Sequence, residues 1–268
     1  MGNRPEIRGL LIDLDGVLYV GKETVPGARE ALQRLTDAGL PVRFLTNTTT
    51  KTAQEVASKL EKLGFRINER DIFSAVTATR AYLTSQRGDG PLPSLHLLVR
   101  QSIMSEFAGF PHASLETGDG APDFVVVGDI GAAWSYPLLN TVFNELMSDA
   151  KLVAMHRNKY WQTPDGLRMD IGAFVTGLEY VSGREAVVIG KPSADFFRLA
   201  VDSLGVPPGN IAMVGDDIET DVGGGQAAGV NGILVKTGKY RPETATRSRV
   251  QPELTLNSIA DLPDELGL

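Results

Sequence analysis

No cysteine occurs in the chain, which excludes disulfide bonds, cysteine-based zinc sites and thiol nucleophiles. No run approaches 18 apolar residues, so we expect no membrane-spanning helix. No block of lysine and arginine marks a surface for nucleic acid or anionic membrane, and the formal net charge is −7. The first residues, MGNRPEIRG, have no basic-then-apolar signal region. We therefore expect a cytoplasmic protein that binds neither nucleic acid nor membrane.

What the sequence does contain is the composition of an ordinary globular protein. Hydrophobic residues make up 42% and charged residues 22% of the chain. Its 268 residues approach the size at which a single hydrophobic core stops growing. One large domain, or one domain with a second inserted into it, would both fit this length.

Strand and helix signals alternate over the first 75 residues and again over the last 80. Such alternation predicts a parallel sheet with crossover helices. We expect an α/β fold in which residues 1–77 and 185–268 form a doubly wound parallel-sheet core, with an inserted α/β module at residues 78–184. The predicted core strands are 7–12, 41–46, 186–190, 211–215 and 232–235; those of the insertion are 95–99, 124–127 and 152–156. Helices are predicted over 26–39, 51–63, 137–148 and 194–204, a hairpin or long loop over 158–172, and a weak helix or coil over 251–268.

Polar side chains follow the predicted core strands at the points where those strands end. In an open parallel sheet, ligands bind outside the carboxyl ends of the strands. We therefore expect carboxylates, a hydroxyl and an amine to gather at one edge of the sheet. The residues in question are Asp13 and Asp15, Thr46 and Asn47, Lys191, and Asp216 and Asp217.

Asp13 and Asp15 are two positions apart, so in an extended segment their side chains point the same way. With Asp216 they would form a cluster of negative charge. Like charges this close raise one another's pKa unless a cation joins them. Mg²⁺ fits, because it takes carboxylate oxygens and also binds substrate phosphate. Lys191 would add a positive charge for the same phosphate.

Each motif taken alone has an ordinary structural interpretation. An Asp-Gly pair favours a turn, and Thr-Asn after a strand is often the beginning of a helix. Four such motifs in order, each at a strand end, favour a functional site instead. The motifs are Asp13–Leu18 (DLDGVL), Phe44–Asn47 (FLTN), Gly190–Pro192 (GKP) and Gly215–Asp221 (GDDIETD).

These motifs resemble those of the haloacid dehalogenase (HAD) superfamily, and the resemblance extends over essentially the whole chain. A module inserted between the second and third motifs resembles the C2 cap of subfamily IIA, the NagD-like group. Residues 42–50, 177–180 and 232–241 are similar to a branch of that subfamily whose members tend to carry serine at the position of Asp15. Because the acid is present here, the resemblance favours ordinary phosphatase chemistry.

The resemblance implies a Mg²⁺-dependent phosphatase that hydrolyses small phosphomonoesters through an aspartyl-phosphate. It implies that Asp13 is the nucleophile and Asp15 the general acid and base. The metal would be held by Asp13, the backbone carbonyl of Asp15, and Asp216. The phosphate would be bound by Thr46, Asn47 and Lys191. Two further acids, Asp217 and Asp221, would position Lys191 or a metal-bound water without contacting the phosphate themselves.

The insertion is where we expect substrate selection. Residues 160–166 (YWQTPDG) with 168–170 are one candidate specificity segment, and residues 129–136 are another. A plain hairpin with exposed aromatic residues is an equally good interpretation of the first segment. Relatives in the subgroup often dimerise through the cap, which implies a possible homodimer.

Three other functions stay open on the sequence alone. The chain would be a phosphoamidase or inorganic pyrophosphatase if its substrates were phospholysine, phosphohistidine or pyrophosphate. It would be a dehalogenase if it needed no metal, although Asp15 and Asp216 count against this. It would be a non-catalytic phospho-ligand binding protein if turnover had been lost, and the full set of motif residues argues against that.

Overall fold

The computed structural model describes residues 6–163 and 166–268. The chain divides into two compact units, each with its own sheet. The first unit, the core, comprises Met1–Thr46, Ala53–Phe73 and Lys191–Leu268, and the second comprises Asn47–Thr52 and Ser74–Gly190. The expected limits of the insertion, residues 78 and 184, both lie inside the second unit.

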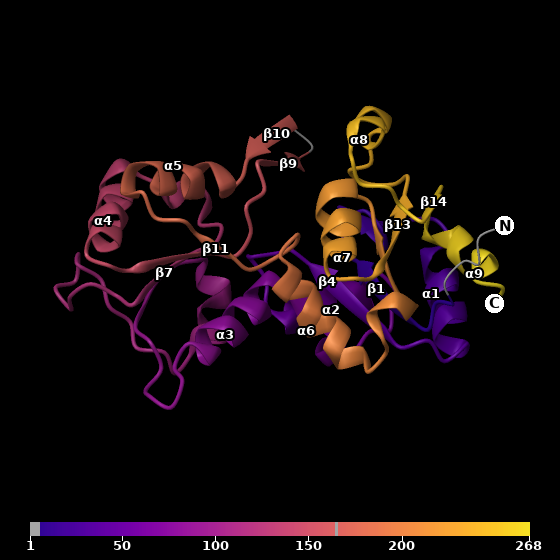
Figure 1. Cartoon of the computed structure of the whole chain (residues 1–268), viewed down its shortest axis with the longest axis horizontal. Helices are drawn as coiled ribbons and strands as arrows, with labels where there is room; N and C mark the ends of the chain where they lie inside the picture. Colours follow the sequence, from indigo (N-terminus) through magenta and orange to yellow (C-terminus); the bar gives the residue numbers. More distant parts are fainter. Residues whose placement is uncertain (1–5, 164–165) are drawn as a thin grey trace. The chain divides into compact units, whose positions relative to one another are not determined.

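The sheet of the core has the strand order β14-β13-β12-β1-β4-β5. Figure 1 labels four of these strands, β14, β13, β1 and β4. The pairings of β1 with β12 and β4, of β12 with β13, and of β13 with β14 are all parallel. The strands are short and apolar, as expected for strands covered on both faces. They are β1 (Gly9–Asp13), β4 (Val42–Thr46), β5 (Ile72–Ser74), β12 (Ile211–Gly215), β13 (Asn231–Val235) and β14 (Leu254–Leu256).

Helices pack on both faces of this sheet, which confirms the predicted doubly wound α/β fold. On one face, α1 (Ala28–Asp37) and α2 (Ala53–Lys62) bury apolar stripes spaced three and four residues apart against the strands. On the other, α6 (Ala194–Leu204) contacts β1, β4 and α7 (Gly224–Ala227). The core also contains β2 (Tyr19–Val20), β3 (Glu23–Thr24), a π-helix (Ile218–Gly223), α8 (Pro242–Arg247), α9 (Leu262–Glu265) and short 3-10 turns at Glu69–Asp71, Pro208–Asn210 and Ile259–Asp261.

The second unit is built on a parallel sheet of order β11-β8-β7-β6. Helices α4 and α5 contact one another (Figure 1). Their apolar residues are buried with Val125 and Val127 of β7. On β7, Phe124 instead meets the ring of Tyr82 from α3. The elements are α3 (Ala75–Ser85), β6 (Leu95–Leu98), a 3-10 helix (Gln101–Phe107), β7 (Phe124–Val127), a 3-10 turn (Gly131–Ala133), α4 (Tyr136–Met147), β8 (Lys151–Ala154), α5 (Gly172–Ser182) and β11 (Val187–Val188).

Two sequence predictions about strands are wrong. The strand predicted at 186–190 for the core sheet is β11, which pairs with β8 in the second unit. A short apolar run such as VVIG has no periodicity that identifies its partner strand. The tail, predicted as weak helix or coil, does contain a short helix, α9, but it also supplies the core strand β14, which was not predicted.

The segment at 158–172 is the hairpin of β9 (Tyr160–Thr163) and β10 (Gly166–Met169), paired antiparallel. Pro164 and Asp165, part of the candidate specificity segment, lie outside the described residues. Tyr160 and Met169 are exposed, at 59% and 62%. These exposures leave the hairpin as a candidate for substrate contact and equally as a plain surface hairpin.

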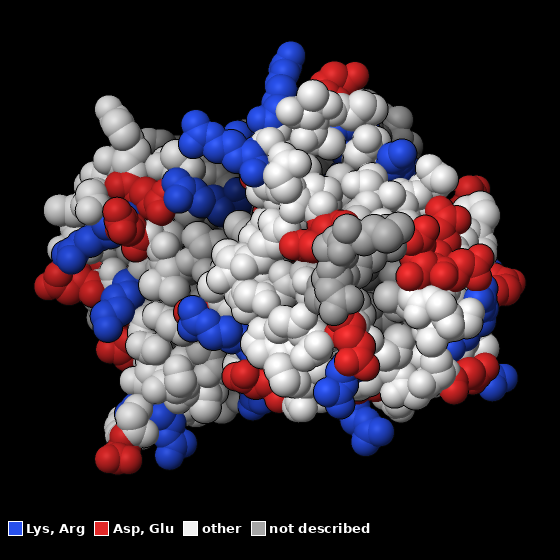
Figure 2. Space-filling view, turned by 45° about the vertical axis from the view of Figure 1, so that its right-hand side comes forward, with Lys and Arg blue, Asp and Glu red and all other residues white. Residues whose placement is uncertain are grey.

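Over the residues that the structure describes, no helix has both the length and the apolar character to cross a membrane. Acidic and basic side chains are both spread over the face drawn in Figure 2.

Candidate active site

The carboxyl ends of β1 and β12 lie at the point where the strand order reverses. From β1 the chain moves outward to β4 and β5, and from β12 it moves the other way to β13 and β14. Ligands of open α/β sheets bind at such a switch point, outside the carboxyl ends of the strands. Ile12 pairs with Val214, so Asp13 ends β1 close to where Asp216 follows β12.

Three carboxylates meet at this switch point and form what we call the acidic cluster: Asp13, Asp216 and Asp221. Each offers a carboxylate oxygen, and these oxygens all lie within 4.8 Å of one another. All three residues are buried, with exposed fractions of 4%, 1% and 1%. Three buried negative charges this close repel one another, so the arrangement requires cations or protons.

Lys191 supplies one of those cations. Its ammonium Nζ lies 2.7 Å from Asp13 Oδ1 and 2.7 Å from Asp221 Oδ1, and the residue is 4% exposed. Desolvation by burial acts to lower the pKa of Lys191, but the charges of Asp13 and Asp221 outweigh it and raise that pKa. Lys191 therefore stays charged and holds the side chain of Asp13 in place.

Asp216 sits in a cradle formed by two turns. Its Oδ2 accepts a 2.6 Å hydrogen bond from the backbone N–H of Lys239. Gly16 and Gly238 both have positive φ, and a Cβ at either position would overlap Asp216 Oδ2. The two turns are joined by Thr237, whose hydroxyl donates to the Gly16 carbonyl at 2.5 Å.

The second oxygen of Asp216 marks a place for a metal ion. Within the described parts of the chain, Asp216 Oδ1 is buried and has no hydrogen-bond partner. A buried carboxylate oxygen without a partner is costly unless a cation binds it. The donors are all oxygens, which is the set that Mg²⁺ prefers. The residues present therefore fit this ion.

Burial and mutual repulsion shift the pKa values of two members of the cluster. Desolvation, with the charges of Asp13 and Asp221, raises the pKa of Asp216 to about 8, against a smaller opposing effect of Lys239. Desolvation also raises the pKa of Asp221 to about 6, although Lys191 acts to lower it. Without a metal ion, Asp216 therefore binds a proton at neutral pH.

The structure also locates the remaining predicted site residues. Thr46 is the buried last residue of β4, directly after Leu45, which pairs with Asp13. Asp15 is exposed and bridges to Tyr19, so its side chain meets solvent while the acidic cluster is buried. Asn47 belongs to the second unit, where its side-chain oxygen lies against Gly190.

The two acids predicted to lie behind the site differ in their contacts. Asp221 Oδ1 binds Lys191, and its Oδ2 accepts the N–H of Asp217 at 3.1 Å. Both oxygens of Asp221 thus bind protein groups, which suits an acid that positions Lys191. Asp217 Oδ1 instead accepts the N–H groups of Glu219 and Thr220, at 3.0 Å each, and caps the π-helix.

Two further features border the acidic cluster and were not predicted from the sequence. The Thr237–Lys239 turn follows β13, so the rule that polar residues at strand ends form the site would have found it. Tyr19 is the second. Burial first, then the charges of Asp15 and Asp13, raise the pKa of its hydroxyl, and Lys59 Nζ lies 3.5 Å from its ring centroid. An aromatic residue six positions after Asp13 carries no sequence signal that distinguishes it from core packing.

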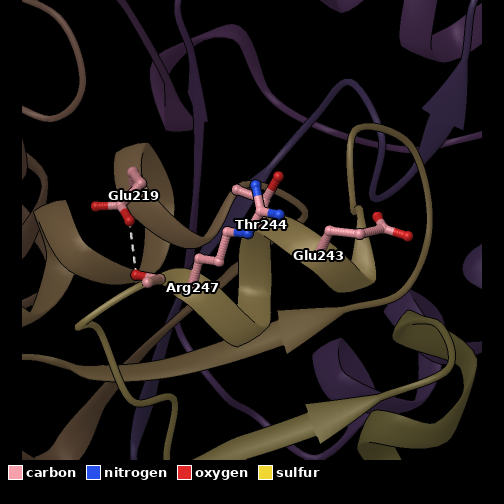
Figure 3. Close-up of a pocket in the computed structure, with 5 residues that line it drawn as sticks. Glu219, Glu243, Thr244 and Arg247 are labelled. Atoms are coloured by element: carbon pink, nitrogen blue, oxygen red, sulfur yellow. Dashed lines mark hydrogen bonds between the residues drawn. The ribbon is translucent and has the colours of Figure 1, made fainter.

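A separate hollow of about 230 Å³ lies beside the π-helix (Figure 3). One wall is fixed by Ser248, whose hydroxyl donates to Glu219 Oε1 at 2.6 Å. Its lining mixes both charges and includes no member of the acidic cluster, so we place the candidate active site at the cluster. The lining residues are Glu219, Glu243, Thr244, Arg247 and Ser248.

Sequence comparison finds relatives over the full length of the chain. Residues 10–109 match the family described as haloacid dehalogenase-like hydrolase, and residues 188–262 match one described as HAD-hydrolase-like. The chain is 40% identical to haloacid dehalogenase-like hydrolase domain-containing protein 2 of Bos taurus, over 99% of this chain and 98% of that protein. It is 35% identical to phospholysine phosphohistidine inorganic pyrophosphate phosphatase of Rattus norvegicus, over 97% and 94%.

Solved structures agree with this relationship. The p-nitrophenyl phosphatase from Archaeoglobus fulgidus superposes with a TM-score of 0.88 at 25% identity, covering 97% of this chain and all of that one. NagD from E. coli K-12 superposes with a TM-score of 0.83 at 27% identity, covering 96% and 98%. The motifs, the doubly wound core and these full-length relatives agree, and the chain belongs to the haloacid dehalogenase-like hydrolases, within the NagD-like subfamily IIA.

Proposed function

We propose that the protein is a Mg²⁺-dependent phosphatase that hydrolyses small phosphorylated metabolites through an aspartyl-phosphate on Asp13. The observation that carries this proposal is the meeting of Asp13, Lys191 and Asp216 at the switch point, with Asp216 Oδ1 buried and unpaired. Membership of the hydrolase family and the phosphatases among its relatives support the same reaction class.

In the first step, a carboxylate oxygen of Asp13 attacks phosphorus and the bond to the leaving oxygen breaks. Asp15 donates a proton to that oxygen, so the product leaves as an alcohol. The exposure of Asp15 supports this role, because a general acid must reach a leaving group that departs into solvent. Lys191 and Thr46 stabilise the charge on the phosphoryl oxygens.

In the second step, a water molecule attacks the phosphorus of the aspartyl-phosphate and loses a proton to Asp15. The bond between phosphorus and Asp13 breaks, which releases phosphate and restores both carboxyl groups. Asp13, the backbone carbonyl of Asp15, and Asp216 would hold Mg²⁺. When bound, this ion neutralises charge on the acids and the phosphate.

We assign the choice of substrate to the second unit, which we propose to be a C2-type cap. Its hairpin and the segment at 129–136 are the candidate specificity elements. Exposed apolar side chains on α4 and α5 support a homodimer through this unit, and light scattering on the intact protein tests that proposal. They are Tyr136, Met147, Tyr180 and Val181.

A second candidate function is hydrolysis of phosphorus–nitrogen or diphosphate bonds. The printed name of the Rattus norvegicus relative, at 35% identity, favours it. Cleavage of a phosphate ester requires a proton for the leaving alcohol, whereas cleavage of a phosphorus–nitrogen bond depends less on Asp15. The Asp15→Asn variant should therefore lose activity on esters more than on phospholysine.

A phosphate-release assay over a panel of compounds, with and without Mg²⁺, tests the proposed function. The panel holds sugar phosphates, pyridoxal phosphate, phospholysine, phosphohistidine and pyrophosphate. We expect release from at least one phosphomonoester, abolished by EDTA and restored by Mg²⁺. Activity that survives EDTA, or no release from any compound, contradicts the proposal.

A further inference from the structure

The Thr237–Lys239 turn brings to the site a cation that none of the four motifs includes. Lys239 donates its backbone N–H to Asp216 Oδ2, so this residue borders the acidic cluster. The residue as a whole is exposed, and its charge interacts with those of Asp13, Asp216 and Asp221. The ammonium group therefore lies within electrostatic reach of the cluster.

Lys239 differs from Lys191 in burial and in its contacts. Lys191 is buried, and its ammonium is held between Asp13 and Asp221. Across residues 6–163 and 166–268, no carboxylate forms an ion pair with Lys239. An ammonium beside a proposed phosphate site, with no acid of its own, can bind an anionic group of the ligand.

We propose that Lys239 binds an anionic group on the leaving-group side of the substrate. The enzyme would then prefer phosphate compounds whose leaving group carries a second anion, either a phosphoryl or a carboxylate group. The inference rests on the proposed phosphatase function. Lys191 is buried against Asp13, the proposed nucleophile, whereas Lys239 is an exposed residue that borders the cluster at Asp216.

The turn offers a substitution that removes the ammonium alone. Lys239→Met keeps the backbone N–H that binds Asp216, so the cradle of that acid persists. Lys236→Met is the matched control, because Lys236 is an exposed lysine three residues earlier. Lys239→Arg restores the positive charge and should restore the preference.

The experiment measures kcat/KM for pyrophosphate, phosphoglycolate and ethyl phosphate. Ethyl phosphate has the same two-carbon chain as phosphoglycolate, with a methyl group in place of the carboxylate. We expect Lys239→Met to lower kcat/KM about tenfold on compounds with the second anion, mainly through KM, and less than about twofold on ethyl phosphate. A loss on pyrophosphate alone, or on phosphoglycolate alone, identifies which anion Lys239 binds.

Three results would overturn the inference. An equal loss on all three compounds means that Lys239 contacts the transferred phosphoryl group. No loss on any compound means that Lys239 does not bind substrate. A rise in the half-saturating Mg²⁺ concentration of Lys239→Met, as large as its loss in kcat/KM, means that Lys239 acts through Asp216.

A binding measurement separates failure of this inference from failure of the proposed function. Calorimetry on the Asp13→Asn variant, with and without Lys239→Met, compares the same three compounds without turnover. Lys239→Met should weaken binding of the compounds with a second anion about tenfold. Equal affinities overturn the inference even if no compound is hydrolysed, whereas absent hydrolysis by the wild-type protein counts against the phosphatase proposal alone.

Discussion

At the scale of single residues, the site is an assembly of buried charges. Asp13, Lys191 and Asp221 are each at most 4% exposed, and Lys191 binds both acids directly. A buried ion pair is weak evidence for stability, because desolvation offsets much of the attraction. Such groups are better explained by the proposed reaction, and removing the partner of any one of them should have a measurable effect.

Removing Lys191 should destabilise the fold as well as the reaction. In Lys191→Met, Asp13 and Asp221 remain buried without their cation, and we expect a loss of about 3 kcal/mol in the free energy of unfolding at pH 7. Urea denaturation without Mg²⁺ measures this loss, with Lys236→Met as the exposed control. Equal stability of the two variants would show that Lys191 does not balance the acids.

Binding of Mg²⁺ should depend on pH because Asp216 has a pKa of about 8 in the metal-free protein. Between the ordinary carboxyl pKa and about 8, Asp216 in the folded state holds a proton that the unfolded chain has already released. The free energy of unfolding without metal therefore falls as pH rises through this range. Mg²⁺ must displace this proton. We expect its affinity to fall by up to about tenfold per pH unit below that value.

Calorimetry between pH 6 and 9 checks this dependence, and titrations in two buffers of different ionisation enthalpy count the protons released. Asp216→Asn should remove the proton release assigned to Asp216 and weaken the dependence of metal-free stability on pH, leaving the part that comes from the raised pKa of Asp221. The same Mg²⁺ affinity at pH 6 and pH 8 would contradict the assignment of Asp216 as a ligand.

At the scale of elements, the turn after β13 fixes Asp216. Gly238 has φ +55°, and any Cβ there would overlap Asp216 Oδ2. Gly238→Ala should therefore displace the acid and raise the half-saturating Mg²⁺ concentration by at least about tenfold, as for groups that orient metal ligands. The matched control is Gly205→Ala, since Gly205 has φ +65° and no atom within 4 Å of its Cβ position.

Both glycine variants should lose about 1 kcal/mol of stability from the strained backbone, as left-handed positions impose on non-glycine residues. Magnesium titrations with circular dichroism before and after the titration separate strain from displacement of Asp216. If Gly205→Ala shifts the magnesium requirement as much as Gly238→Ala does, then Gly238 does not act by leaving room for Asp216.

The elements that the sequence predicted correctly are those whose periodicity or boundaries are strong. Helix α1 was visible in Ala28, Ala31, Leu32 and Leu35, and β1 and β12 in their uniformly apolar runs. The convergence of Asp13 and Asp216 followed from the strand-end rule, because the topology of a doubly wound sheet brings those ends together.

Other features could not be predicted, because long-range pairing decides them. The two valines of β11 carry no sign that they pair with β8. Strand β14 is only three residues long and is stabilised by pairing with β13. The role of Gly238 depends on its distance to Asp216, which lies 22 positions earlier in the chain.

At the scale of the whole molecule, each unit has its own hydrophobic core and its own buried polar contacts. In the second unit, Glu145 of α4 is fully buried and lies 2.7 Å from His96 Nδ1 of β6. Its other oxygen accepts the Ser114 hydroxyl at 2.9 Å and the Leu115 N–H at 3.0 Å. One carboxylate thus joins a helix, a strand and a loop within that unit.

Glu145→Ala should leave those three partners unsatisfied and lower the free energy of unfolding by about 2–4 kcal/mol. Glu116→Ala, at an exposed glutamate of the same loop, should change it by less than about 0.5 kcal/mol. Chemical denaturation with fluorescence detection provides the comparison. A small effect at Glu145 would mean that water satisfies its partners.

The most direct test of the central claim is the rate of phosphate release by the Asp13→Asn variant, on whichever phosphomonoester the wild-type protein hydrolyses fastest. Asparagine keeps the size of the side chain and removes the attacking carboxylate. We expect turnover to fall at least about a thousandfold, as for other covalent nucleophiles, while the folded structure is retained. Turnover at the wild-type rate would show that Asp13 does not form the aspartyl-phosphate.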